Sequence, residues 1–151
     1  MVRGVYYLVI ELVQDLIVNV GRLGSLNLTK GTYVYVGSGK GSGGIYKRVL
    51  RHYSKSKKVF WHIDYLTVSN YVKVVNAVVV AENTLNESSL TMLVGIDECF
   101  KPVAEGFGCS DVRNDRTHLF KYICHHDVID YLIRKLINFG VNPSLISLIS
   151  D

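Results

Sequence analysis

The chain has 151 residues, 48% of them hydrophobic, a length that suits one domain with an ordinary apolar core. Its formal net charge is +4, and no apolar run approaches the roughly 20 residues of a membrane-spanning helix. The apolar start, residues 1–13, carries Arg3 and Glu11 and alternates like a strand, unlike a signal peptide. We therefore expect a soluble protein that stays inside the cell.

The first half of the chain predicts strands followed by a helix. These elements are strands at 5–13, 17–20 and 31–36, a loop at 21–30, and a helix at 45–54. Arg48 and His52 lie four positions apart in that helix, so they share one of its faces.

Two apolar stretches and another helix follow. Residues 61–66 are expected to alternate across a strand, and the valine-rich stretch 72–81 suits a strand because its residues are β-branched. The next helix begins near Asn86 and ends at Gly95.

The tail predicts an amphipathic helix that begins after Asp127 and is stopped by Gly140. The apolar residues 145–149 suit either an edge strand or a dimer contact. We therefore predict an α+β fold with a small, mainly antiparallel central sheet flanked by helices. Residues 1–126 would form the domain, and residues 127–151 a helix and tail packed on it.

Three cysteines, Cys99, Cys109 and Cys124, are an odd number without Cys-x-x-Cys spacing. This pattern argues against a disulfide framework and against a structural zinc site. We expect three free thiols.

Positive charge is concentrated between Leu16 and Ile63, where there is no acidic residue. The nine bases of this stretch are Arg22, Lys30, Lys40, Lys47, Arg48, Arg51, Lys55, Lys57 and Lys58. Such a run is either a solvated surface with extended lysines or a binding surface for a polyanion. Five of these side chains are expected to contact DNA: Lys40, Lys47, Arg51, Lys57 and Lys58.

Two tyrosines on predicted strands, Tyr6 and Tyr35, accompany Arg48 and His52 in this basic part of the chain. Cutting a phosphodiester requires a positioned water, a group that takes its proton, and positive charge near the phosphate. These four side chains could supply those parts, although any one tyrosine or histidine alone would more often be structural.

Several stretches of the chain resemble the GIY-YIG nuclease superfamily, and within it the archaeal Uri-type endonucleases (domain of unknown function 123). The matching stretches are Gly4-Val5-Tyr6, residues 31–38 (Gly-Thr-Tyr-Val-Tyr-Val-Gly-Ser), residues 48–52, residues 58–66 with Trp-His-Ile-Asp-Tyr-Leu, residues 106–111 (Gly-Phe-Gly-Cys-Ser-Asp) and His118-Leu119-Phe120. They span residues 4–120, and the tail helix lies beyond them.

The resemblance implies that Tyr6 and Tyr35 lie side by side on neighbouring strands and that one of them positions or deprotonates the water. A tyrosine needs a nearby cation to act as a base, and Arg48 could be that cation while also binding the phosphate. His52 would be a second base or a phosphate donor.

The resemblance also implies that one helix glutamate holds a divalent cation, Mg²⁺ or Mn²⁺. Glu87, in the first turn of its helix, is the preferred ligand, and Glu82 is the alternative. A carboxylate at a helix N-terminus could also simply complement the helix dipole.

Other polar residues have less specific interpretations. His62 and Asp64, on one face of the expected strand, would make a structural hydrogen bond or contact nucleic acid. A second polar cluster near the site could comprise Ser110, Asp111, Arg113, Arg116 and His118.

The stretch Gly39–Gly44 fits the Gly-x-Gly-x-x-Gly pattern of dinucleotide-binding proteins, and Asp64 follows at a suitable distance. The crowded bases of the next helix and the short chain favour instead a loop that approaches DNA phosphate, so no nucleotide cofactor is expected. The sequence thus predicts a metal-dependent DNA endonuclease that acts in DNA repair or in the processing of branched DNA. The alternative is a DNA-binding module of the same fold without cleavage.

Overall fold

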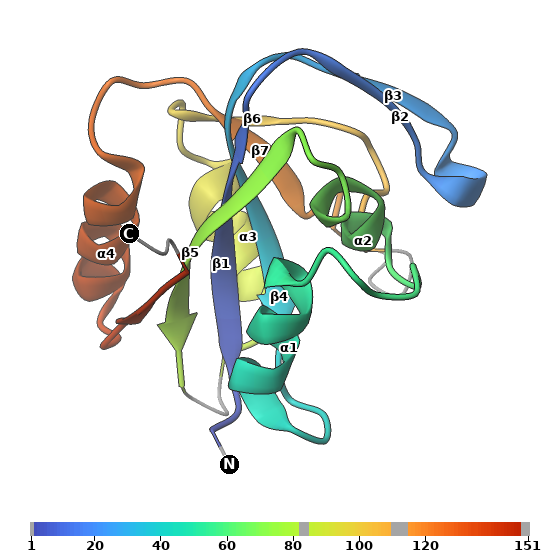
Figure 1. Cartoon of the computed structure of the whole chain (residues 1–151). Coiled ribbons are helices and arrows are strands. Elements are labelled where there is room, and N and C mark those ends of the chain that lie inside the picture. The colour runs from blue at the N-terminus through green and yellow to red at the C-terminus, as the bar shows by residue number, and fades with distance from the viewer. Residues whose placement is uncertain (1, 82–84, 110–114, 149–151) are drawn as a thin grey trace.

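The computed structural model describes residues 2–81, 85–109 and 115–148, and its fold is α+β as predicted (Figure 1). The strands are β1 (Val5–Leu12), β2 (Leu16–Asn19), β3 (Ser25–Leu28), β4 (Gly31–Ser38), β5 (Val72–Val80), β6 (Phe100–Pro102), β7 (Leu119–Tyr122) and β8 (Ser144–Ser147). The helices are α1 (Gly44–Tyr53), α2 (His62–Thr67), α3 (Glu87–Gly95) and α4 (Val128–Phe139). Six strands form one sheet in the order β6-β7-β4-β1-β5-β8, while β2 and β3 form a separate hairpin.

Strand β1 lies inside the sheet, and both of its faces are buried. Tyr6, Leu8 and Ile10 point to the face covered by α1 and α2, and Tyr7 and Val9 point to the face covered by α3 and α4. A strand buried on both sides needs apolar residues on both faces, which explains why β1 is hydrophobic at every position except Glu11. The strand pairs that the structure describes in this sheet are antiparallel, in agreement with the predicted sheet.

Two predicted elements are wrong. Residues 21–30 are not a loop, because a short 3₁₀ turn (Gly21–Leu23) leads into β3, which pairs with β2. Residues 61–66 are not a strand, because α2 occupies residues 62–67. Its buried side chains include Ile63, Leu66 and Thr67, at the three- and four-residue spacing of a helix face.

The tail packs on the sheet. The Asp127 side chain caps α4 by accepting hydrogen bonds from the amides of Ile129 and Asp130, and Leu132 and Leu136 are buried in the core beneath it. After α4, β8 pairs with β5 at the edge of the sheet, so the edge-strand interpretation of the tail is confirmed.

The expectation of three free cysteines is wrong. Cys99 and Cys124 form a disulfide, and only Cys109, which is buried, is a free thiol among the described residues. Pairing of β6 with β7 brings the two half-cystines together, since the Ile123 amide donates to the Cys99 carbonyl. Their separation of 25 residues gives no local sign of this contact.

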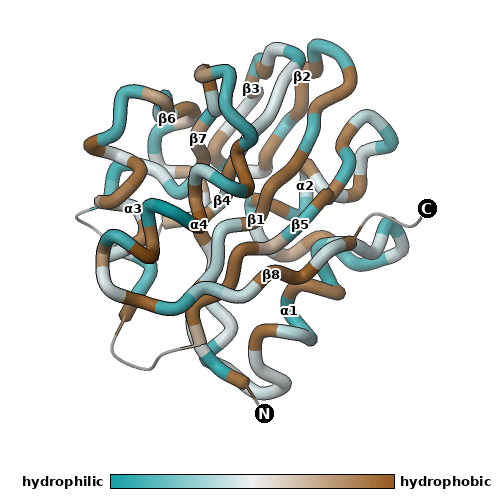
Figure 2. The backbone as a smooth tube through the Cα atoms, turned by 90° about the vertical axis from the view of Figure 1, so that its left-hand side faces the viewer, coloured by the Kyte–Doolittle hydropathy of each residue, from teal (hydrophilic) through white to brown (hydrophobic). Residues whose placement is uncertain are grey.

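Hydrophobic segments recur along the strands and helices, whereas the peripheral turns are largely hydrophilic (Figure 2). Across the described part of the chain, every helix is too short or too polar to cross a membrane.

Candidate active site

The two predicted site tyrosines lie on adjacent strands. Tyr6 of β1 pairs with Gly37 of β4, Leu8 pairs with Tyr35, and both tyrosines belong to the core under α1 and α2. A Cβ atom at Gly37 would lie 2.4 Å from Cζ of Tyr6, so only glycine leaves room for the tyrosine ring. The structure therefore pairs the Gly-Val-Tyr stretch with the Tyr-Val-Gly stretch, and the glycine of the second leaves space for the tyrosine of the first.

His52 of α1 lies against both rings. Its Nε2 atom is 2.6 Å from the Tyr6 hydroxyl, and its ring centroid is 6.0 Å from that of Tyr35. Burial lowers the pKa of His52 to about 3, so the ring is neutral near neutral pH. In the tautomer with its proton on Nδ1, the Nε2 atom can accept a hydrogen bond from the Tyr6 hydroxyl. Because His52 is only 1% exposed, its contact is with Tyr6 and not with solvent.

Burial raises the pKa of both tyrosines above the ordinary value of 10.0. The Arg48 guanidinium lowers both pKa values, whereas Glu87 raises them. Arg48 thus lowers the two tyrosine pKa values by less than burial raises them. Both hydroxyls keep their protons near neutral pH and can donate hydrogen bonds.

Arg48 is half-buried and stacks on Trp61, with its guanidinium carbon 4.0 Å from the ring centroid. Within the described ranges, its side chain makes no hydrogen bond or ion pair. A guanidinium that is fixed in place and pairs with no acid in the described residues can donate two parallel hydrogen bonds to a phosphate.

Glu87 is the first residue of α3, whose N-cap is Asn86. Its Oε2 atom is 3.1 Å from Nδ1 of the fully buried His118, whose Nε2 is 2.7 Å from Oδ2 of Asp115. Burial lowers the pKa of His118, but the two carboxylates outweigh it, and the net pKa is raised. His118 therefore holds Glu87 in place, a contact that sequence reasoning missed because 31 positions separate the two residues.

The Gly-Phe-Gly-Cys block lies beside Tyr35. Phe107 meets the Tyr35 ring edge-on at 6.1 Å, and the Gly108 amide donates to Nδ1 of His62 at 2.9 Å. A Cβ atom at Gly108, where φ is +72°, would lie 2.8 Å from Cε1 of Tyr35. This glycine therefore allows both the left-handed backbone and close contact with the tyrosine.

The donor set at Glu87 suits Mg²⁺ or Mn²⁺ held by one carboxylate, waters and substrate oxygens. The Glu87 side chain is 30% exposed, and its Oε1 makes no hydrogen bond to any residue the structure describes. In residues 2–81, 85–109 and 115–148, no group of three or more His, Cys, Asp or Glu side chains could hold an ion by itself. The alternative ligand, Glu82, lies outside the described residues, as do Ser110, Asp111 and Arg113 of the expected polar cluster.

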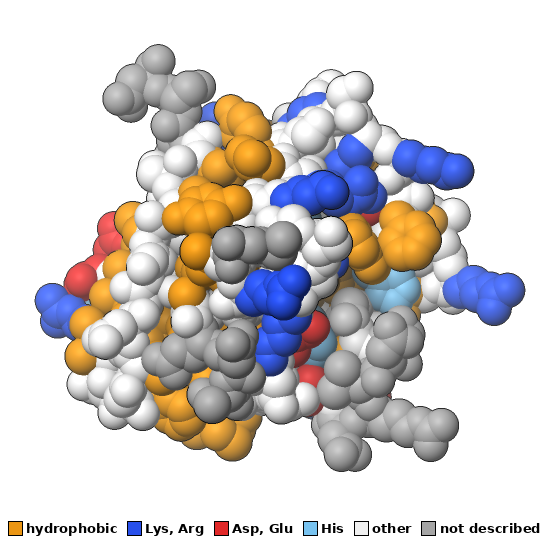
Figure 3. Space-filling model, turned by 90° about the horizontal axis from the view of Figure 1, so that it is seen from below, with side chains coloured by type: hydrophobic (Ala, Val, Ile, Leu, Met, Phe, Trp, Pro, Cys, Tyr) orange, Lys and Arg blue, Asp and Glu red, His pale blue; other side chains and the backbone are white. Residues whose placement is uncertain are grey.

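Three of the five lysines and arginines expected to contact DNA are exposed. Lys47 lies on α1, Lys58 follows it, and Lys40 reaches the Leu85 carbonyl from the loop after β4. Figure 3 shows Lys and Arg side chains gathered on the lower face of the molecule, with acidic and histidine side chains exposed between them.

Lys57 and Arg51 have a structural role instead. The Lys57 side chain is only 4% exposed, and its ammonium donates to the Arg51 and His52 carbonyls at the end of α1. The Lys57 ammonium is therefore bound within the protein, and the DNA contact expected of it stays a prediction. Arg51 is partly exposed, but it is bound to Asp64 at 2.7 Å and to the Lys58 carbonyl at 2.8 Å.

Asp64 is fully buried and connects α1 with α2. Besides Arg51, it accepts hydrogen bonds from the amides of Phe60 and Trp61, both at 2.9 Å. The expected bond between Asp64 and His62 is wrong, because on a helix residues two positions apart point in different directions. Asp64 instead fixes Trp61, on which Arg48 stacks.

Comparison with known proteins adds one result. No match is found among curated proteins or among solved structures. One family model matches residues 5–140, which includes α4 and so extends beyond the stretches that carry the resemblance. The chain therefore belongs to the family described as Domain of unknown function DUF123.

Proposed function

We propose that this protein is a metal-dependent endonuclease of the GIY-YIG superfamily, which hydrolyses DNA phosphodiester bonds inside the cell. The observation that carries the proposal is that Tyr6 and Tyr35 lie on adjacent strands against His52, with Arg48 one turn away on the same helix. Glu87 reaches the same place, because it pairs with His118, which lies with Tyr35 beside Gly108. These residues come from four separate elements. Their hydroxyls, a guanidinium that pairs with no acid in the described residues and a partly exposed carboxylate match the needs of phosphate-ester hydrolysis.

In this proposal, Arg48 binds a nonbridging oxygen of the scissile phosphate and stabilises the charge that develops there. The hydroxyls of Tyr6 and Tyr35 orient the attacking water, and the hydrogen bond between Tyr6 and His52 holds the Tyr6 hydroxyl in position. Glu87, held by His118, is the residue that would hold Mg²⁺ or Mn²⁺. The cation, when bound, supplies Lewis-acid stabilisation of the phosphate and leaving group.

DNA is the proposed substrate because exposed lysines lie on the helix that carries Arg48 and in the segments before and after it. The exposed lysines Lys40, Lys47 and Lys58 lie in a stretch without acidic residues, so a polyanion meets little repulsion there.

A DNA-binding module without cleavage is the second candidate. The raised pKa values of Tyr6 and Tyr35 favour it, since a protonated tyrosine cannot deprotonate water until another positive charge lowers its pKa.

A cleavage assay on a panel of linear and branched DNAs with Mg²⁺ or Mn²⁺ tests the proposal. Glu87→Gln should retain DNA binding and lose cleavage, because a site with one carboxylate has no second protein ligand to compensate. Glu82→Gln is the comparison and should stay active. An exchange of these two results would make Glu82 the ligand. Binding without cleavage by the wild-type protein on every substrate would favour the non-catalytic module.

A further inference from the structure

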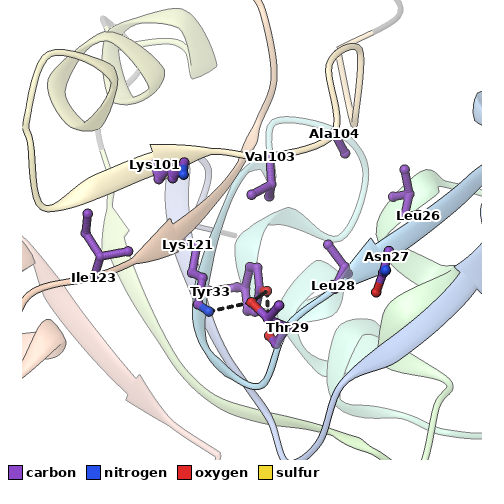
Figure 4. A pocket seen from close by; sticks show the side chains of 10 residues that line it. All are labelled: Leu26, Asn27, Leu28, Thr29, Tyr33, Lys101, Val103, Ala104, Lys121 and Ile123. Carbon is purple, nitrogen blue, oxygen red and sulfur yellow. Dashed lines mark hydrogen bonds between the residues drawn. The ribbon is translucent and has the colours of Figure 1, made fainter.

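A groove lies on the same face of the sheet as the candidate active site, at the edge formed by β6 and β7. Its volume is about 410 Å³, and its walls come from β3, β4, β6 and β7 (Figure 4). Aliphatic side chains, among them Leu26, Leu28 and Val103, form much of the lining.

Two lysines stand side by side in this groove. Tyr33 pairs with Lys121, and Lys121 pairs with Lys101, so the three side chains form one row across β4, β7 and β6. Like charges directly opposite each other destabilise a sheet. Neither lysine forms an ion pair with any acid in the described ranges, and Lys121 donates only to the Thr29 hydroxyl.

The groove is placed to receive the same ligand as the active site. Tyr33 and Tyr35 point to one face of β4, and Gly37, beside Tyr6, is four residues from Tyr33. At about 3.3 Å per residue this is roughly 13 Å, or about four base-pair steps of DNA. The nearby acid, Asp15, already accepts a hydrogen bond from the Lys30 amide.

We propose that Lys101 and Lys121 bind a backbone phosphate of the DNA about four base pairs from the scissile bond, while the aliphatic walls contact its deoxyribose. This inference rests on the proposed function and adds a second contact site to it. A phosphate between the two ammonium groups would remove their repulsion, which is what makes an anion the favoured occupant.

Fluorescence anisotropy with a labelled 20-base-pair duplex in EDTA measures binding without cleavage. For Lys101→Gln/Lys121→Gln, the slope of log affinity against log salt should become shallower by about 0.9, the amount lost with one phosphate contact. Lys73→Gln is the matched control, an exposed strand lysine whose neighbours Val72 and Val74 point to the site face. It should leave the slope unchanged.

Three results would overturn the inference. An unchanged slope in the double variant, with normal DNA binding by the wild type, would refute the groove contact alone. Competition by polyglutamate as effective as by DNA of equal charge would assign the groove to acidic proteins. Absence of DNA binding by the wild type would refute the proposed function and the groove contact with it. Thermal melting of Lys101→Gln tests whether this lysine instead stabilises the fold. The proposal expects no fall in Tm relative to the wild type.

Discussion

Asp64→Asn should destabilise the protein by roughly 3 kcal/mol. The carboxylate is fully buried and accepts a charged hydrogen bond from Arg51. The Asn amide oxygen could still accept this bond, but without the negative charge that strengthens it and offsets the guanidinium, which costs about 2 kcal/mol. The Asp64 carboxylate also lies 3.9 Å from the buried ammonium of Lys57, which would lose its counter-charge at a cost of about 1 kcal/mol or more. Urea unfolding followed by circular dichroism measures the change in the free energy of unfolding.

Asp130→Asn is the matched control, since Asp130 also pairs with an arginine, Arg134, at 3.1 Å. That pair is exposed, so its loss should cost about 0.5 kcal/mol or less. A cost below about 1 kcal/mol for Asp64→Asn would refute the argument that Asp64 holds α1 and α2 together.

The same carboxylate predicts a pH dependence. Burial raises the pKa of Asp64, but hydrogen bonds from Trp61, Phe60 and Arg51 outweigh it, so the folded-state pKa lies below the ordinary 3.8. A depressed pKa contributes stability that is present above the unfolded pKa and is lost as pH falls through the folded one. The wild type should therefore lose more stability than Asp64→Asn below about pH 4. Parallel acid curves for the two proteins would contradict this.

Three further outcomes are expected. Arg48→Ala should abolish cleavage while the free energy of unfolding changes by about 1 kcal/mol or less. Arg48→Lys should restore little activity, because lysine cannot make the two-bond contact of the guanidinium with a phosphate. Cleavage assays and urea unfolding of the same variants measure both. Reduction of Cys99–Cys124 should lower the free energy of unfolding by about 3 kcal/mol, since it releases a loop closed over 25 residues, whereas Cys99→Ser should not respond to reductant. Gly37→Ala should destabilise by about 1–3 kcal/mol, because its methyl group would overlap the Tyr6 ring; thermal melting measures this loss.

Each of these results can fail. Wild-type turnover in Arg48→Ala would remove Arg48 from the site. Equal stability with and without reductant would mean that the disulfide contributes nothing. A Gly37→Ala protein that melts like the wild type would show that Tyr6 moves aside at no cost.

Local sequence patterns determined much of the fold. The apolar runs of β1 and β5, the alternation in β4 and the capped amphipathic helix α4 each carry a signal within a few residues, and all four elements are present. The resemblance implied that Tyr6 and Tyr35 lie side by side, and helix periodicity put Arg48 and His52 on one face. The structure places the tyrosines on adjacent strands and His52 against both of them.

Tertiary structure decided what depends on distant contacts. Periodicity could not distinguish a six-residue helix from a strand at residues 62–67, because the burial of α2 depends on how it meets α1 and the sheet. The Cys99–Cys124 disulfide and the Glu87–His118 pair likewise join residues that no local pattern relates.

The charged residues show the same division most clearly. The sequence establishes that a basic stretch exists, but all of its lysines and arginines look alike there. Only the fold turns Lys57 inward, ties Arg51 to Asp64 and leaves Arg48 without an acidic partner among the described residues. Whether a positive charge serves the structure or remains available to a phosphate depends on the surfaces that pack around it, and those are set by the whole chain.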